Sequence, residues 1–398
     1  MTTAGFIIAR LASTLILLSF LFTLYWILHA YDYGHALLKL ACFSILFTVI
    51  VGFQIVKARA VVPRGARWAE VVVLLIVLQG SFLLQFGTYT NNVFDPPVSD
   101  IGYTTVHAAK VLIIEGENPY SRTDINYDRK DMDPGFRGFH YGPVMIAGYL
   151  PTAFLPAYSY KLISILYVLI SVLLLVLLVI KPEESEIEHV ANAMFVLVAY
   201  FIAKRFWLEV LYEGANDVFH IMLILAALLG LKKGKIFLAG LFTGLSMAAK
   251  FAPGAFLMPF MPVRERNFWF GLGIGLTPYL PFLIWDPAGL WRNVFWLRVV
   301  IPPDFTSLYW ITPSSLHWIF GAVMLTSCLA AVWWAVRREL EFKAVLVGFT
   351  LLLIVVDVTQ KQIHGNHLIW FYPLVALLFM DYREKLYSLF VARWMTPK

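Results

Sequence analysis

An acidic residue stands directly ahead of an amphipathic stretch in a long polar segment of the chain. The segment 89–141 carries Asp95 and Asp100, and apolar residues then recur at helical spacing from 101 to 115. A carboxylate held at a lipid–water boundary can act as a general base that takes a proton from an acceptor hydroxyl. Asp100 or its neighbour Ser99 can equally cap the helix that follows. Both interpretations of Asp100 stay open, and one residue can serve both.

Two further carboxylates lie in the turn that precedes the apolar run at 216–232. Glu213, Asn216 and Asp217 can cap the helix that starts there, or they can orient a hydroxyl of a substrate facing Asp100. A divalent ion would need several oxygen or imidazole ligands, and no closely spaced acidic cluster supplies them. We therefore expect chemistry that needs neither a metal ion nor another cofactor.

Cationic and imidazole side chains could stabilise an anionic leaving group. Lys250 follows small residues in an apolar segment, where an unpaired ammonium is expensive unless its side chain extends to the interface. Arg205 can support it or anchor a helix at the membrane surface. His364 and His367 have a metal-like spacing and form an incomplete zinc set with Asp357, so binding of a substrate is the better functional hypothesis. A plain polar turn at the interface is the alternative.

The elements that must position these residues are membrane helices. The chain is 60% hydrophobic and 14% charged, and its apolar runs are long enough to cross a hydrocarbon layer of about 30 Å. The pattern predicts an all-α, polytopic integral membrane bundle with about eleven to thirteen crossings. The first run is too long for a cleavable signal and is expected to be retained. The expected spans are 5–29, 36–57, 68–88, 159–181, 189–206, 216–232, 267–285, 312–336, 342–359 and 366–381.

Two segments are expected not to cross the membrane. The stretch 142–157 is short and interrupted by prolines, and the stretch 235–262 is broken around Lys250 and Pro253, which gives two short helices. With the basic loop at 57–67 in the cytoplasm, the polar segments then gather on the outer face of the plasma membrane. The net charge of +6 reflects such loops, so nucleic acid is excluded as a partner.

An ordered series of short motifs resembles a known pattern. It consists of Asp100-x-x-Tyr103, Gly116-x-x-Pro119-Tyr120, Tyr141-Gly142-Pro143, Gly214-x-Asn216, Ala239-Gly240 to Lys250, and a late His367 before Tyr372-Pro373. From about residue 68 to 380 the sequence is similar to GT-C class membrane glycosyltransferases. In particular, it resembles the mannosyltransferases that depend on polyprenyl-phosphate-mannose.

The resemblance implies a function that composition cannot supply. Asp100 matches the acidic residue that acts as base in the family, whose donor is a lipid-linked monosaccharide phosphate and whose reaction inverts the anomeric centre. The implied partners are that donor, a glycolipid, glycan or protein acceptor, and membrane lipids. Tyr103 and Tyr120 would belong to the substrate-binding residues, with Glu213, Asn216, Asp217, Lys250, His364, His367 and Arg205.

Some features depart from the family pattern. Gly142 stands where the family often has proline, Gly214-Ala-Asn216-Asp217 replaces a common Gly-Gln-x-Asn, and two helices in 1–67 precede the usual first span. We expect these helices to form an addition to a GT-C-like catalytic domain at 68–398, with an outer loop at 89–158 that contains Asp100.

Two other classes of protein compete with an enzyme. A transporter or flippase of a lipid-linked sugar would place charges near the midplane and show two related halves, whereas the sequence shows one broken element and no evident repeat. A scaffold without chemistry would not require acidic and basic residues from separate segments to gather. Convergence of Asp100 and Lys250 in space is therefore the prediction to examine.

Overall fold

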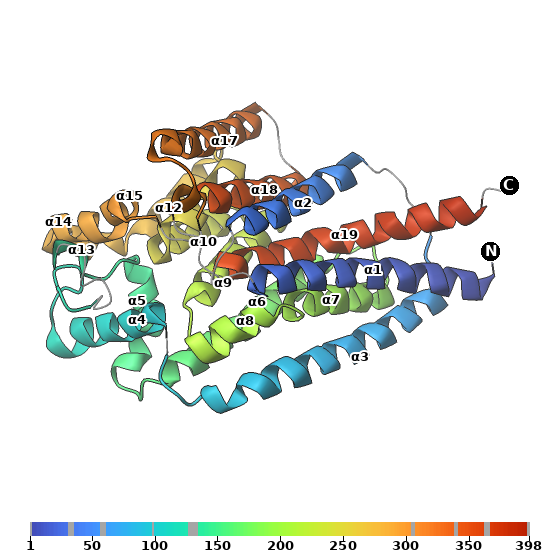
Figure 1. Ribbon diagram of the computed structural model, residues 1–398, viewed down its shortest axis with the longest axis horizontal. Helices are drawn as coiled ribbons and strands as arrows, with labels where there is room; N and C mark the ends of the chain where they lie inside the picture. The colour runs from blue at the N-terminus through green and yellow to red at the C-terminus, as the bar shows by residue number, and fades with distance from the viewer. Residues whose placement is uncertain are drawn as a thin grey trace. The chain divides into compact units, whose positions relative to one another are not determined.

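The regular elements of the chain are helices. The computed structural model describes residues 2–30, 36–55, 61–97, 99–125, 134–303, 307–337, 341–361 and 367–395, and no strand occurs within them (Figure 1). The predicted all-α class is confirmed. The chain divides into two compact units, described here one at a time.

Unit 1 comprises residues 1–88, 175–207 and 363–398. Its long helices α1 and α19 lie side by side, and α7 packs against both (Figure 1). The bounds are α1 (Thr3–Ala30), α2 (Ala36–Ile55), α3 (Arg64–Tyr89), α7 (Glu186–Phe201), α8 (Lys204–Trp207) and α19 (Leu368–Met395). Helices from the beginning, middle and end of the sequence thus form one unit.

Unit 2 comprises residues 89–174 and 208–362. Helix α10 packs along both α9 and α12, and α4 packs against α5. The first half of the unit contains α4 (Asp100–Lys110), the π-helical η2 (Val111–Glu115), α5 (Pro143–Tyr149), η5 (Leu150–Ala153), most of α6 (Ser159–Val179) and the π-helical η6 (Leu208–Glu213). The second half contains α9 (Asp217–Lys232), α10 (Ile236–Ala249), α11 (Phe251–Leu257), α12 (Arg266–Leu276), α13 (Tyr279–Trp285), α14 (Pro287–Leu290), the π-helical η8 (Trp291–Trp296), α15 (Leu297–Val300), α16 (Leu308–Ile311), α17 (His317–Arg337) and α18 (Phe342–Thr359).

Five helices of the described chain are individually long and apolar enough to cross a membrane, or six if one bent pair forms a single span. The bent pair is α12 and α13, which the sequence predicts as one helix at 267–285. The chain turns by 50° between them. Pro278 lies at this break, where proline cannot donate a backbone hydrogen bond and its ring collides with the preceding turn. The chain is a multi-pass membrane protein, and the larger predicted number of crossings stays a prediction.

Both segments expected to be too short or broken to cross have that form. Helix α5 has 7 residues, which is about 10 Å of helix and far less than a membrane. Helix α10 ends at Ala249 and α11 begins at Phe251, so the expected break falls on Lys250. The predicted domain boundary at residue 67 stays a prediction.

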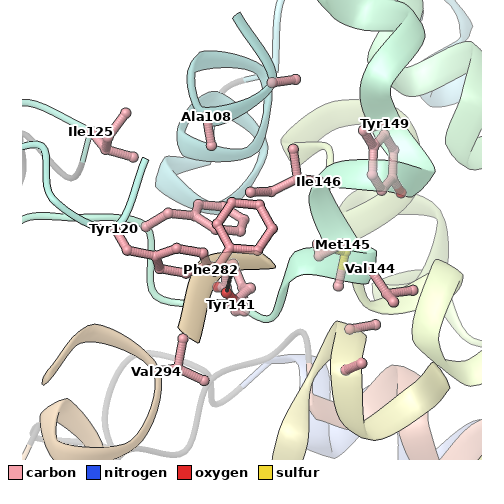
Figure 2. Packing of buried hydrophobic residues seen from close by; sticks show 14 of the residues in the cluster. Ala108, Tyr120, Ile125, Tyr141, Val144, Met145, Ile146, Tyr149, Phe282 and Val294 are labelled. Atoms are coloured by element: carbon pink, nitrogen blue, oxygen red, sulfur yellow. Dashed lines mark hydrogen bonds between the residues drawn. The ribbon is translucent and has the colours of Figure 1, made fainter. Parts of the chain in front are cut away.

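A buried apolar cluster in unit 2 joins the polar loop to the helices (Figure 2). The helix expected at 101–115 forms, as α4 and η2, and Ala108 and Val111 are buried in this cluster. Ile114, expected on the same face, is 60% exposed. The π-helical turn explains the difference, because an extra residue per turn rotates the residues that follow away from the apolar face.

Candidate active site

The helix that carries Asp100 begins with a capped turn. Ser99 has extended backbone angles, and its Oγ accepts a hydrogen bond from the backbone N–H of Gly102 at 3.2 Å. Ser99 is therefore the cap, and the alternative in which Asp100 caps the helix is wrong. Asp100 is the first helical residue, and its side-chain atoms lie outside the described part of the structure.

The start of α4 is attached to the turn that precedes α9. The backbone N–H of Ser99 donates to the carbonyl oxygen of Glu213 at 2.9 Å. The Asn216 side-chain Nδ2 donates to Thr105 Oγ1 at 3.1 Å, so Asn216 does not cap α9 with its side chain. Asp100 and the carboxylate-bearing turn, 113 positions or more apart in sequence, thus belong to one bonded assembly.

The closeness of this attachment depends on two glycines. A Cβ atom on Gly102 would lie 2.6 Å from the carbonyl oxygen of Gly214, which leaves no room for a side chain. Gly214 itself has φ of 77°, a conformation that residues with a Cβ rarely adopt. The turn Gly214-Ala-Asn216-Asp217 differs from the family's usual Gly-Gln-x-Asn, but it keeps the glycine, which this backbone conformation requires.

A buried ion pair joins the same turn to the break between α10 and α11. Lys250 Nζ lies 2.5 Å from Asp217 Oδ1, with the Lys250 side chain 9% exposed and that of Asp217 fully buried. His220 Nδ1 lies 3.9 Å from the same carboxylate oxygen, and the ring centre of Tyr141 lies 5.3 Å from Nζ. The alternative in which Lys250 extends to the membrane interface is wrong, because the ammonium is held by a carboxylate within the protein.

Gly142 attaches a further segment to this break. Its backbone N–H donates to the carbonyl oxygen of Ala249 at 2.9 Å, and a Cβ atom on it would lie 2.1 Å from the carbonyl oxygen of Ala248. Proline, which the family often has here, lacks the N–H and would collide with that carbonyl. The glycine is required by this close approach to the residues just before Lys250.

The two tyrosines singled out in the outer loop differ in environment. Tyr120 is fully buried beside Phe282, and its hydroxyl donates to the carbonyl oxygen of Tyr141 at 2.9 Å (Figure 2). Burial raises the pKa of Tyr120 well above its ordinary value, so the hydroxyl stays protonated as a donor. Tyr103 is 46% exposed and has its ring edge toward His107. Tyr120 thus positions the Tyr141 segment, whereas Tyr103 is accessible to a ligand.

Sequence reasoning missed Asn293, a buried residue that ties the loop together. Its Nδ2 donates to the carbonyl oxygens of Tyr120 and Gly289, each at 3.0 Å, and its Oδ1 accepts from the Gly138 N–H at 3.1 Å. The signal was a lone amide among the aromatic residues of η8. A buried amide must find hydrogen-bond partners, which is why such a residue indicates a structural hub.

The described structure assigns no site contact to the side chains of the remaining predicted residues. Glu213 contributes its backbone and has a partly exposed side chain. His364 and the side chain of Arg205 lie outside the described residues. His367 belongs to unit 1, where it is buried with its ring 4.4 Å from that of Trp370. Their roles stay predictions.

Within the described residues, no three His, Cys, Asp or Glu side chains gather closely enough to hold a metal ion. The expectation that the chemistry needs no metal stays a prediction. What the described geometry brings together is the start of α4, the turn at 213–217 and the break at Lys250, which are three of the segments expected to converge.

The apolar helices and the buried ion pair of unit 2 define the general class of polytopic membrane proteins with an internal polar site. Residues 139–356, more than half of the chain, match the model of glycosyltransferase family 87. The chain belongs to this family of GT-C-like membrane glycosyltransferases. The matched region includes Asn216, Asp217 and Lys250, and it begins after Asp100. The sequence matches no curated protein.

Proposed function

We propose that this membrane glycosyltransferase transfers a hexose, with mannose as the first candidate, from a polyprenyl-phosphate donor to a glycolipid, glycan or protein acceptor. The reaction takes place on the outer side of the plasma membrane and inverts the anomeric centre. Membership of glycosyltransferase family 87 supports transfer of a sugar. The membrane helices suit a donor and an acceptor that reside in or at the lipid bilayer.

The observation that carries the proposal is the Asp217–Lys250 pair, 2.5 Å apart and buried beside the turn that holds the start of α4. An ion pair in a membrane protein is costly to bury, so this pair is a candidate functional site. It lies on the broken element, where irregular backbone at membrane depth is expected to line a polar site.

In the proposed reaction, the Asp100 carboxylate takes the proton of an acceptor hydroxyl. The acceptor oxygen forms a bond to C1 of the sugar as the bond between C1 and the phosphate oxygen breaks, and polyprenyl phosphate leaves with the electron pair. Lys250 stabilises the negative charge that develops on this phosphate, and Asp217 holds the ammonium in place. Tyr103 is proposed to contact the acceptor, and His364, His367 and Arg205 remain proposed substrate-binding residues.

The test measures transfer from radiolabelled polyprenyl-phosphate-mannose by the purified protein and by its Asp100→Asn variant. Loss of a general base should lower the rate by roughly 10²- to 10⁴-fold. Asp95→Asn is the matched control, since Asp95 is an exposed carboxylate of the same loop, hydrogen-bonded only locally to Asn92 in the described structure, at 3.3 Å. It should retain the wild-type rate.

Equal activity of the Asp100→Asn and wild-type proteins would contradict the role of Asp100 as base. A wild-type protein that transfers glucose but not mannose from the same lipid would correct the sugar and leave the mechanism. Inactivity with every polyprenyl-phosphate sugar tried would contradict the proposed donor class.

A further inference from the structure

The ammonium of Lys250 has an aromatic neighbour as well as a carboxylate. It lies over the ring of Tyr141, with Nζ 5.3 Å from the ring centre, and Oδ1 of Asp217 lies 2.5 Å from the same Nζ. A cation within about 6 Å of the face of an aromatic ring is attracted to it, most strongly where water is excluded. Tyr141 is 4% exposed and Lys250 7%, so water is largely excluded from this contact.

The backbone places the Tyr141 ring next to the ammonium. Gly142, which follows Tyr141, donates its N–H to the carbonyl oxygen of Ala249, which precedes Lys250, at 2.9 Å. Tyr141 and Lys250 therefore adjoin the two ends of one backbone hydrogen bond, although they come from distant parts of the sequence. The close approach that requires glycine at position 142 also brings these two side chains together.

Neighbouring aromatic residues hold the Tyr141 segment in place. The Tyr120 hydroxyl donates to the carbonyl oxygen of Tyr141 at 2.9 Å (Figure 2), and the ring centre of Phe139 lies 5.6 Å from that of Tyr141 in an edge-on arrangement. Tyr120 and Phe139 are themselves fully buried. A ring packed in this way has little freedom to turn away from the ammonium.

A ring face and a carboxylate hold an ammonium in different ways. The carboxylate accepts a directed hydrogen bond and neutralises the charge, whereas the ring attracts the charge and carries no net charge of its own. A second carboxylate in place of Tyr141 would make the site anionic and repel a phosphate. An aromatic ring instead fixes the ammonium without adding a charge that opposes a negatively charged substrate.

We infer that Tyr141 is a positioning residue of the transfer reaction, and that the face of its ring holds the Lys250 ammonium beside Asp217. The inference rests on the proposed function, in which Lys250 stabilises the negative charge of the leaving phosphate. This charge grows as the transition state is reached, so an ammonium that is poorly positioned should lower kcat rather than raise KM.

The test removes the Tyr141 ring and, separately, changes its electron density at nearly constant shape. Tyr141→Leu removes the ring, and Tyr141→Phe keeps it. Phenylalanines with increasing ring fluorination, placed at position 141 by codon suppression, weaken the attraction of the ring face for a cation. For each purified protein, kcat and KM for transfer from polyprenyl-phosphate-mannose are measured, together with the folded fraction.

The matched control is the same fluorinated series at Phe195, whose ring centre lies 4.9 Å from Cζ of Arg383 in unit 1. Tyr141→Leu should lower kcat per folded molecule by about ten- to thirty-fold, and Tyr141→Phe should keep most of the wild-type rate. In the fluorinated series at position 141, kcat should fall step by step as fluorine is added. The series at Phe195 should leave kcat at the wild-type level.

A kcat that does not depend on fluorination at position 141 would overturn the inference, because the ring would then only fill space. Equal losses in Tyr141→Phe and Tyr141→Leu would also overturn it, since the hydroxyl rather than the ring face would then be needed. A raised KM with unchanged kcat would do the same. Failure of the proposed function is seen in a different protein: wild type itself would then transfer no sugar from polyprenyl phosphate, and the inference would fall with it.

Discussion

The two compact units each bury charge, and they do so in different ways. In unit 1, Arg10 Nε lies 2.8 Å from Glu70 Oε2, Arg383 Nη1 lies 3.2 Å from Glu70 Oε1, and Glu384 Oε1 accepts from both arginines at 2.6 and 3.1 Å. Arg383 also donates to Asn192. Two cations and two anions from three helices thus form a balanced network in which each charge has several partners.

Among the buried charges of unit 2, Asp217 and Lys250 form an ion pair of one carboxylate and one ammonium. The network of unit 1 joins α1, α3, α7 and α19 and has the features of a structural clamp. The pair in unit 2 joins a turn to the break between two short helices. The difference suggests that a charge network tying several long helices together serves folding, and that an ion pair at a helix break serves a substrate.

The largest expected effect comes from removing the central anion of the unit 1 network. Glu70→Gln leaves Arg10 and Arg383 with one carboxylate between them, so the free energy of unfolding should fall by roughly 3–5 kcal/mol. Denaturation of the purified protein in detergent measures it. Transfer activity per folded molecule should stay at the wild-type level.

The control for this variant is Glu188→Gln. Glu188 pairs with Arg67 in the same unit, where both side chains are partly exposed, and it also accepts hydrogen bonds from Ser185 at the start of α7, which glutamine can keep. Loss of this single pair should cost about 1 kcal/mol. If Glu70→Gln were as stable as Glu188→Gln, the network would not be the clamp of unit 1. If it lost activity while fully folded, the contrast between the units would fail.

Asp217→Asn should have the next largest effect, a loss of about 3 kcal/mol with a drop in transfer rate of more than ten-fold. The reason is that Lys250 would remain buried without its counter-ion. The double variant Asp217→Asn with Lys250→Met removes both charges and should recover most of the stability. Its activity should stay lost.

Denaturation and transfer measured on the same preparations separate the two outcomes. Recovery of both stability and activity in the double variant would mean that the ion pair is only structural. That result would leave the proposed leaving-group role of Lys250 without support.

The helices could be predicted from sequence because each depends on local information. Apolar runs gave elements within a few residues of α1, α6, α9 and α18, and prolines and polar residues indicated the break at Lys250. The bend between α12 and α13 was missed although Pro278 signals it. Where lipid is the solvent, the length and hydropathy of a segment largely decide whether it forms a membrane helix.

The pairings could not be predicted, because they join residues far apart in sequence. Arg10 meets Glu384 across 374 positions, and Asp217 meets Lys250 across 33. The sequence analysis assigned no role to Arg10 and left two possible environments for Lys250. The order of the motifs pointed to Asn216 and Tyr120. Only the structure shows that the Asn216 amide bonds to Thr105 and that the Tyr120 hydroxyl bonds to the backbone of Tyr141.

A smaller effect is expected at Gly142, where the close approach of two backbone segments, rather than a charge, supports the site. Gly142→Ala would place a methyl group 2.1 Å from the carbonyl oxygen of Ala248 and force the segment away from Lys250. The loss in unfolding free energy should be about 1–3 kcal/mol, as for overpacking, and transfer activity should fall more steeply than the folded fraction.

Gly273→Ala is the matched control in the same unit, because nothing lies within 4 Å of its Cβ position. In a helix this change should be neutral or stabilising by about 0.5–1 kcal/mol. Thermal denaturation with parallel transfer assays compares the two. A Gly142→Ala protein with wild-type activity would show that the approach of this segment to Lys250 does not matter for the reaction.

The smallest effect concerns Asp286 of unit 2, whose carboxylate joins the segment around Ser121 to the start of α14. The Ser121 hydroxyl donates to it at 2.6 Å and the Gly289 N–H at 2.9 Å, and these bonds, the Ser121 bond foremost, lower the pKa of Asp286. Because the pKa is lower in the folded protein, the ionised carboxylate stabilises the fold fully at pH values above the ordinary aspartate pKa of about 4. This contribution is lost as the pH falls through the lowered pKa.

Ser121→Ala should therefore raise the pKa of Asp286 toward its ordinary value and make α14 open at a higher pH. Hydrogen exchange of the peptide that covers α14 and η8, corrected for the intrinsic effect of pH, measures the shift between pH 6 and pH 3. Asp286→Asn is the control, since it removes the titrating group and should abolish the transition in this range. An unchanged transition in Ser121→Ala would mean that the backbone of α14 and the charge of Arg292, rather than Ser121, lower the pKa. The loop would then be anchored to this carboxylate from one side only, and Asn293 would be the sole described side chain that ties α14 to the Tyr120 segment.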